Sequence, residues 1–289
     1  MNKKKRVKLI THTGSDIPLE EAEALDIEVI PDKVIFSDKE YNNMTEISSE
    51  EFYEKLKTAT ELPTSSQPSV GDFVKAFHRA AEEADEVLCL MITSKMSGCY
   101  KTAVSASQMV SRQGLKVPIY AYDTQQCSHG MAQMVRAAAV MAEKGFSVRQ
   151  IMDELSHLQK RMGVYFILDS LENAKKGGRV GAITANTVNM LGLKPILKFS
   201  DGLVREFGVA LNYSVGINKI VDQFLKKGDK TYPVTVFHAD APERAIELKK
   251  RILKNIPDVQ IRIETVGPVI GIYTGCGCAG IAFTERENL

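Results

Sequence analysis

Apolar runs of strand length alternate with amphipathic runs of helix length along the first half of this 289-residue chain. The run at residues 87–92 is apolar throughout, which is typical of a parallel strand buried on both faces. Between such runs, apolar residues recur at helical spacing, as at Phe73, Phe77 and Ala81. This alternation predicts an α/β fold whose first part is a doubly wound, mostly parallel sheet with helices on both faces.

The pattern changes after Val164. Residues 195–199 and 203–207 flank a turn at Asp201-Gly202, which predicts a β-hairpin. Further strands at residues 234–237 and 260–263, with a helix between them, predict a second α/β domain with a mixed sheet. We therefore expect two domains. Residues 1–160 would form the N-terminal domain, and residues 161–289 would form the C-terminal domain.

Three helix starts carry a hydroxyl side chain followed three positions later by an acid or amide. Such pairs are typical of a capping box, in which each residue bonds the backbone of the other. The pairs are Ser48 with Glu51, Ser69 with Asp72, and Ser147 with Gln150.

Three short segments rich in hydroxyl groups and glycine lie far apart in the sequence, each beside a predicted strand or helix start. Their hydroxyl and backbone N–H groups are donors suited to an anion. Since no base lies near them in the sequence, they favour a site that holds a small acid over one that breaks a bond. We expect the second and third at the carboxyl ends of strands, where such sheets bind ligands. The segments span residues 64–69, 93–99 and 274–280.

Ser97 is a candidate nucleophile, because it lies on a strand-to-helix turn like the serine of G-x-S-x-G. Lys95 replaces the first glycine of that motif, and a serine hydrolase also needs a base. His12, His129 and His238 lie near strand ends and could line a cleft, whereas His78 and His157 lie on apparent surface faces of helices. An esterase or acyltransferase that uses Ser97 therefore remains an alternative function.

The five cysteines have no framework spacing, which favours a reducing compartment. Cys276-Gly277-Cys278 could bind a metal together with Cys99 or Cys127, but it lacks the second paired motif of a zinc site. A tight turn is the simpler interpretation, and we expect no metal.

The glycines near the C-terminus do not indicate a nucleotide site. Gly267, Gly271 and Gly275 match neither a P-loop nor a dinucleotide fingerprint, and turns beside strands explain them more simply.

The formal net charge of +1 provides no field to attract nucleic acid, so we expect no nucleic-acid partner. Residues 3–6 form a basic run that could touch an acidic surface, although a solvated terminus is the simpler interpretation. No apolar run approaches the length of about 20 residues that spans a bilayer. The run behind the basic N-terminus is too short for a signal peptide. We therefore expect a cytoplasmic protein.

The segments taken together resemble the DegV family, whose members share the ordered motifs T-S-Q-P, S-S-x-L-S-G-T-Y, G-G-R, L-K-P-I and H-T-G-x-G. The resemblance extends from about Lys8 to Phe283, and five motifs in order are specific where one alone would not be. The corresponding residues of this chain are Ser65 to Pro68, Thr93 to Tyr100, Gly177 to Arg179, Leu193 to Ile196, and Tyr273 to Gly277.

The resemblance implies two α/β domains that enclose a long-chain fatty acid such as palmitate, with no catalytic residue and no cofactor. It further implies that the protein presents the acyl carboxylate to a separate fatty-acid kinase subunit, which phosphorylates it. Transient contact with a membrane surface is compatible with such a ligand. The residues that would contact the carboxylate are Ser65, Ser66, Ser97, Gly98, Tyr273 and Thr274. Arg179, in the basic glycine turn, and Arg205, in the predicted hairpin, could each contact the kinase subunit, although solvated arginine is the simpler interpretation. A binder of a different small carboxylic acid is a further alternative.

The chain departs from the family motifs at several positions. Cys99 replaces a threonine, Tyr273 replaces the histidine of the late loop, and His12-Thr13 replaces an early Asp-Ser. Cysteine is a poor hydrogen-bond donor, whereas tyrosine keeps a hydroxyl donor but carries no positive charge. The head-group site of this chain is therefore expected to differ from the family pattern at these places.

Overall fold

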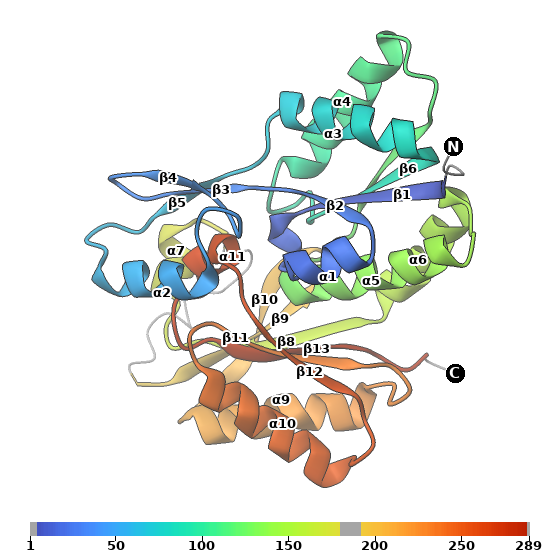
Figure 1. The fold of residues 1–289 in the computed structure, drawn as a ribbon. Helices are drawn as coiled ribbons and strands as arrows, with labels where there is room; N and C mark the ends of the chain where they lie inside the picture. The colour runs from blue at the N-terminus through green and yellow to red at the C-terminus, as the bar shows by residue number, and fades with distance from the viewer. Residues whose placement is uncertain (1–4, 180–191, 288–289) are drawn as a thin grey trace.

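The first half of the chain forms the expected parallel sheet in a computed structural model, which describes residues 5–179 and 192–287 (Figure 1). Its strands lie in the order β2-β1-β6-β7, and all pair in parallel. Helices α3 and α4 cover one face and α1, α5 and α6 cover the other, which confirms the doubly wound arrangement. The strands are β1 (Lys5–His12), β2 (Ile27–Ile30), β6 (Ala84–Met91) and β7 (Ile119–Asp123). The helices are α1 (Leu19–Ala24), α3 (Val70–Glu83), α4 (Cys99–Arg112), α5 (Ser128–Glu143) and α6 (Val148–Lys160), and a short 3-10 turn, η1 (Thr13–Ser15), follows β1.

Helix positions follow from the local sequence signals. The capping boxes expected at Ser48, Ser69 and Ser147 are all formed, each with a hydroxyl that accepts from the backbone three residues on. In β6, residues 87–91 are completely buried, as a strand covered by helices on both faces requires. These signals are local, so the sequence predicted them directly.

The second half of the chain forms a six-stranded mixed sheet in the order β10-β9-β8-β13-β11-β12. The expected hairpin joins β9 to β10 through Asp201 and Gly202, which both have positive φ. Helices α9 (Tyr213–Lys227) and α10 (Pro242–Asn255) pack on one face of this sheet (Figure 1). The strands are β8 (Met162–Ile167), β9 (Lys194–Ser200), β10 (Leu203–Ala210), β11 (Val234–His238), β12 (Ile261–Thr265) and β13 (Ala279–Thr284).

A third, three-stranded antiparallel sheet, in the order β4-β3-β5, was not predicted. Helix α11, from the far end of the chain, packs against this small sheet and against α2 and α7. The sheet thereby joins residues near position 65 to residues near position 273. Its elements are β3 (Lys33–Ile35), β4 (Glu40–Asn42) and β5 (Thr64–Ser66), with α2 (Ser49–Thr58), α7 (Glu172–Lys176) and α11 (Pro268–Thr274) beside it.

The three hydroxyl- and glycine-rich segments take different places in this fold. Residues 93–99 follow β6 and lead into α4, as predicted. Residues 64–66 are themselves strand β5, and Ser69 caps α3. The third placement was wrong, because Thr274 is the last residue of α11 and the rest of the segment leads into the start of β13, so it does not lie at the carboxyl end of a strand.

Gly271 also lies inside α11 and not in a turn. A Cβ at this position would come within 2.7 Å of the Tyr53 hydroxyl and 2.8 Å of the Phe52 ring. Glycine is therefore required at position 271 by the close approach of α11 to α2, which no local pattern indicates.

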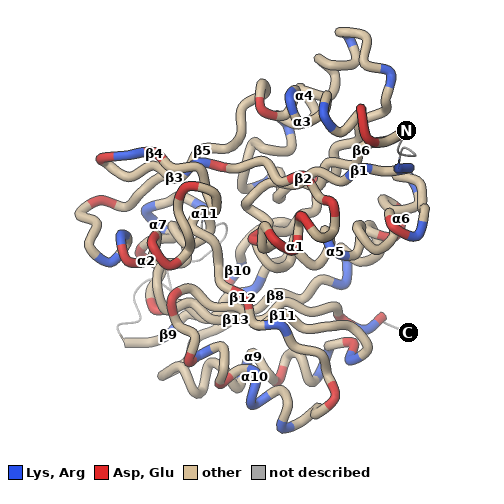
Figure 2. The backbone as a smooth tube through the Cα atoms, viewed as in Figure 1, with Lys and Arg blue, Asp and Glu red and all other residues tan. Residues whose placement is uncertain are grey.

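Charged residues of both signs are interspersed over the chain (Figure 2), as the small net charge suggests. No helix in the described part of the chain is long and apolar enough to cross a membrane. Lys3 and Lys4 of the basic run lie outside the described residues.

Candidate functional site

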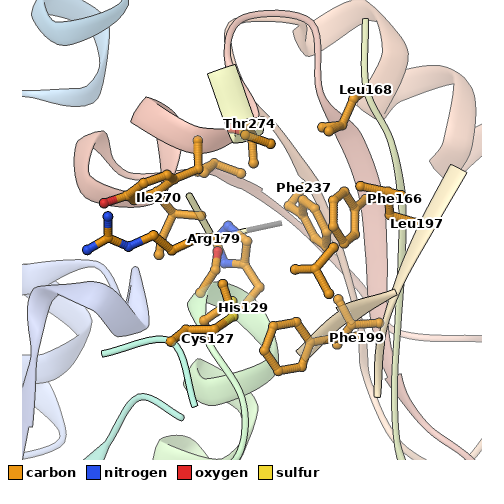
Figure 3. Close-up of a pocket in the computed structure, with 17 residues that line it drawn as sticks. Cys127, His129, Phe166, Leu168, Arg179, Leu197, Phe199, Phe237, Ile270 and Thr274 are labelled. Carbon is orange, nitrogen blue, oxygen red and sulfur yellow. The ribbon is translucent and has the colours of Figure 1, made fainter. Parts of the chain in front are cut away.

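An apolar cavity with about 710 Å³ of empty space, including its opening to solvent, lies between the two halves of the chain (Figure 3). Strands β8 and β9 contribute large apolar side chains such as Phe166, Leu197 and Phe199 to its wall. Met96 and the start of α5 line it from the first half of the chain, and α11 lines it near the small sheet. The apolar lining suits a hydrocarbon chain more than a polar ligand.

Arg179, Tyr273 and Thr274 also line this cavity, and the Arg179 guanidinium points away from the apolar side chains (Figure 3). The Tyr273 hydroxyl lies 2.9 Å from Ser65 Oγ, and the Arg179 guanidinium carbon lies 5.4 Å from the centre of the Tyr273 ring. Thr274 Oγ1 is buried and has no hydrogen-bond partner among the described residues. Because an unpaired buried hydroxyl is costly, Thr274 offers a free donor at the cavity wall.

Gly177 allows the basic turn to approach Tyr273. A Cβ on Gly177 would overlap the Tyr273 ring. The backbone of Gly177 has an ordinary negative φ, so the ring and not the backbone conformation demands glycine here. The G-G-R turn is therefore fitted to this tyrosine.

Ser97 and Gly98 lie beside Gln67 at the start of α4. Ser97 Oγ is 3.4 Å from Gln67 Oε1 and accepts from the Cys99 backbone N–H at 3.2 Å. A Cβ at Gly98 would lie 2.9 Å from Gln67 Oε1, and Gln67 in turn donates to Thr102 at 2.6 Å. The sequence interpretation did not single out Gln67, although it stands inside the S-S-Q-P motif.

The six expected carboxylate contacts thus fall into three groups. Tyr273 and Thr274 line the cavity directly, and Ser65 reaches it through the Tyr273 hydroxyl. Ser97 and Gly98 lie next to Met96, which lines the cavity, but are not part of its wall. Ser66 lies on a separate polar groove with Lys33 and Arg79. The structure therefore joins Ser65 to Tyr273 and Ser97 to Gln67.

The two candidate partner residues have different surroundings. Arg179 is exposed and donates to the Gly177 carbonyl at 2.7 Å. Arg205 lies in β10, with 39% of its side chain exposed, and is 3.5 Å from the Asp201 carboxylate. Arg179 is thus placed at the cavity, whereas Arg205 belongs to the hairpin.

His129, one of three histidines expected near strand ends, lines the cavity from the second residue of α5. Phe166, Phe199 and Phe237 were not singled out, because inward-facing residues of a strand look the same whether they line a cavity or fill a core. His78 and His157 are exposed, as expected.

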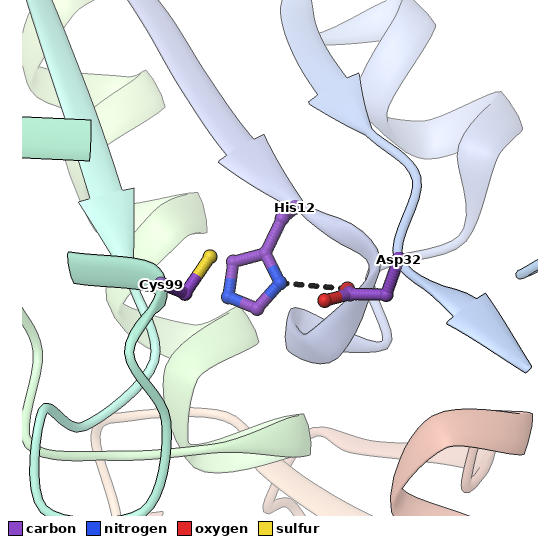
Figure 4. Close-up of side chains that lie close together, drawn as sticks. All are labelled: His12, Asp32 and Cys99. Atoms are coloured by element: carbon purple, nitrogen blue, oxygen red, sulfur yellow. Dashed lines mark hydrogen bonds and ion pairs between the residues drawn. The ribbon is translucent and has the colours of Figure 1, made fainter. Parts of the chain in front are cut away.

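His12, by contrast, is buried at the carboxyl end of β1 in a cluster with Asp32 and Cys99 (Figure 4). His12 Nδ1 lies 2.7 Å from Asp32 Oδ2, and in the neutral ring Nε2 accepts from the Ile92 backbone N–H at 3.3 Å. Burial opposes a charge on His12, but the Asp32 carboxylate and Cys99 raise the pKa of His12 well above its ordinary value of 6.5. His12, Asp32 and Cys99 are all buried, so the cluster lies inside the protein at the start of α4.

Potential ligand atoms of His12, Asp32 and Cys99 lie within 4.8 Å of one another, and within the described ranges no other such group of three occurs. Asp32 Oδ2 takes part in bonds with His12, Thr13 and Gly14. The Cys276-Gly277-Cys278 segment is not part of this group. Burial raises the pKa of Cys276 to about 11 and that of Cys127 to about 12, so neither thiol is readily ionised.

Comparison with known proteins places this fold in a family. The DegV family model matches residues 6–286. The DegV domain-containing protein lin2658 of Listeria innocua is 31% identical over 99% of this chain and 100% of its own length.

Solved structures of DegV family proteins have the same fold as this chain. A DegV family protein from Thermus thermophilus, described by its fatty-acid binding, has a TM-score of 0.88 at 30% identity and covers 96% of this chain and 99% of its own. DegV from Bacillus subtilis, described as a fatty acid binding protein, has a TM-score of 0.87 at 27% identity, with coverage of 98% and 100%. This chain belongs to the DegV family.

Proposed function

We propose that this chain binds a long-chain fatty acid such as palmitate in the apolar cavity and presents its carboxylate to a separate kinase subunit, which forms the acyl phosphate. The observation that supports this most directly is the combination of an apolar wall with a few hydroxyl donors at Tyr273 and Thr274. The fatty-acid binding described for related proteins supports the same class of ligand. The chain would act as a carrier, without a catalytic residue of its own.

The two ends of the ligand would have different tasks. Burial of each methylene contributes about 0.8 kcal/mol, so the tail would supply most of the affinity. A hydrogen bond to a charged carboxylate contributes about 1.5–3 kcal/mol and would fix the orientation. Tyr273 and Thr274 would provide the direct contacts, with Ser65 holding the tyrosine hydroxyl. Ser97, Gly98 and Ser66 lie outside the cavity wall, and they are retained as further proposed contacts of the carboxylate.

The cavity wall also supports the division into residues 1–160 and 161–289. Met96 and residues 127–129 would contribute from the N-terminal domain, and lining residues such as Val164, Phe237 and Thr274 from the C-terminal domain. The acyl chain would then lie between the domains, and Arg179 beside the carboxylate would meet the kinase subunit, with Arg205 as a second contact.

Native mass spectrometry of the purified protein tests ligand binding. We expect a bound acid with a long saturated or unsaturated chain, or uptake of palmitate added to delipidated protein. Protein that is free of lipid as purified and does not bind added palmitate would contradict the proposal.

The alternatives receive less support from the geometry. Ser97 Oγ has Gln67 and the Cys99 backbone as partners, and neither is a base, so an esterase would lack the proton acceptor that it needs. A different small acid would leave most of the apolar wall without a partner. If the protein hydrolyses a p-nitrophenyl ester and Ser97→Ala abolishes this hydrolysis, the esterase function would be supported instead.

A further inference from the structure

A polar side chain interrupts the apolar wall of the cavity at His129. The imidazole is 1% exposed and lines the cavity. In Figure 3 its ring lies among the apolar lining side chains, whereas the guanidinium of Arg179 points away from them. His129 therefore meets the space that the proposed function assigns to the acyl chain.

The two ring nitrogens of His129 have different neighbours. Nδ1 lies 2.9 Å from Glu264 Oε2, and the other oxygen of Glu264 lies 2.6 Å from the Arg136 guanidinium. A carboxylate only accepts, so the proton belongs on Nδ1, because two lone pairs would repel at that distance. Neither ring nitrogen meets the geometry of a hydrogen bond to a described residue, but Nδ1 has the Glu264 carboxylate as its ion-pair partner, whereas Nε2 has no such partner. In the neutral ring, Nε2 is thus a buried acceptor without a donor.

The neighbours of His129 explain why it is held in place but do not use Nε2. The ring packs on Phe237 with 5.2 Å between centres, and Glu264 fixes the other nitrogen. Ser128, the preceding residue, is committed to Asp16, to which it donates at 2.6 Å. An anchoring role accounts for Nδ1 alone, and a saturated hydrocarbon chain would leave Nε2 unpaired. Buried acceptors are normally satisfied, so a donor on the ligand is the missing partner.

We infer that the cavity is selective for an acyl chain that carries a hydroxyl group part-way along its length, with His129 Nε2 accepting from that hydroxyl. This inference rests on the proposed fatty-acid binding and names a substrate class within it. A hydroxyl donates and can satisfy Nε2, whereas an oxo group only accepts and cannot. The site therefore discriminates between two polar acyl chains of nearly equal size.

Competition binding to delipidated protein tests the inference. The competitors are stearate, a series of hydroxystearates that differ in the position of the hydroxyl, and the oxostearate whose oxo group is at the position of the hydroxyl in the tightest-binding isomer. Positional isomers have the same composition, so their ranking reports on the cavity. We expect one mid-chain isomer to bind about tenfold more tightly than the other isomers and the oxo acid, equivalent to one well-placed hydrogen bond. Equal affinity across the isomers, or equal binding of the oxo and hydroxy acids, would overturn the inference.

His129→Phe separates recognition from packing, because it keeps a ring against Phe237 and removes Nε2. We expect the variant to prefer stearate over the best hydroxystearate, reversing the order of the unmodified protein. A merely structural histidine predicts instead that both acids weaken together, which would count against the inference. If His129→Phe does not fold, the isomer ranking on the unmodified protein still decides. If the unmodified protein does not bind stearate at all, the proposed function fails, and the inference fails with it.

Discussion

Ser65 Oγ and the Tyr273 hydroxyl lie 2.9 Å apart, although 208 residues separate them in the sequence. Strand β5 carries Ser65, and the last turn of α11 carries Tyr273, so this bond closes the contact between the small sheet and the far end of the chain. Tyr273 stands where the family motif has histidine. Its hydroxyl keeps a donor beside the cavity without a positive charge.

We expect a double-mutant cycle to detect this bond. Tyr273→Phe and Ser65→Ala each remove one hydroxyl, and a neutral hydrogen bond contributes about 0.5–1.5 kcal/mol. The double variant should therefore lose less unfolding free energy than the sum of the single variants, as measured by urea denaturation. Strict additivity would show that the two hydroxyls do not interact in solution. Tyr232→Phe, at a tyrosine that is 42% exposed, serves as the control.

Gly177→Ala is expected to disturb the cavity by displacing the Tyr273 ring. The added methyl group would overlap that ring, and overpacking of this kind costs about 1–3 kcal/mol. Palmitate affinity should fall together with the melting temperature. Gly208→Ala is a matched control, because a Cβ there meets nothing within 4 Å. An affinity equal to that of the unmodified protein would mean that Tyr273 does not depend on the glycine turn.

Ser97→Ala should weaken fatty-acid binding without unfolding the protein. Loss of one hydrogen bond to a carboxylate costs about 1.5–3 kcal/mol, which is roughly ten- to hundredfold in affinity. Fluorescent fatty-acid displacement measures the change. Ser105→Ala, on the exposed face of α4, controls for general effects of removing a helical serine. If Ser97→Ala binds as tightly as the unmodified protein, Ser97 is not a head-group contact.

The His12–Asp32 pair predicts a pH dependence of stability. The folded-state pKa of His12 is raised above 6.5, so its charge stabilises the folded state. That contribution is complete below the unfolded pKa and is lost as pH rises through the folded-state pKa. The unfolding free energy should therefore decline above about pH 6.5, by at most about 1.4 kcal/mol per pH unit. In His12→Gln this component of the decline should disappear, and parallel curves for the two proteins would exclude His12 as its source.

Arg179→Glu tests the proposed partner contact. Charge reversal at this exposed residue should leave the fold intact and reduce kinase-dependent formation of acyl phosphate, because it would repel a complementary surface. The readout is phosphorylation of bound palmitate by the kinase subunit. Arg149→Glu, at an exposed residue of α6 that does not line the cavity, provides a charge-matched control. Unchanged phosphorylation, with palmitate still bound, would remove Arg179 from the interface.

Local patterns predicted the regular elements well. The apolar run in β6, the capping box at Ser69 and the Asp201-Gly202 turn each depend on residues a few positions apart, and each is formed as expected. Strands β3, β4 and β5 were missed because three residues are too few to show a period. Helix α11 was missed because its glycine-containing sequence resembles a turn, and its packing against α2 is what Gly271 permits.

In the candidate site too, the sequence determined what depends on short stretches of chain, and the tertiary structure decided what depends on packing. The sequence by itself determined the α/β class, the hydroxyl-bearing segments and the membership of Ser65, Ser97 and Tyr273 in family motifs, because these are properties of short stretches of chain. Only the tertiary structure decided that Phe166 and Leu197 line a cavity instead of filling a core. It also decided that Tyr273 bonds Ser65 and that His129 meets the cavity with Nε2 unpaired. Those relationships depend on how distant strands and helices pack, and that packing has no local signature in the sequence.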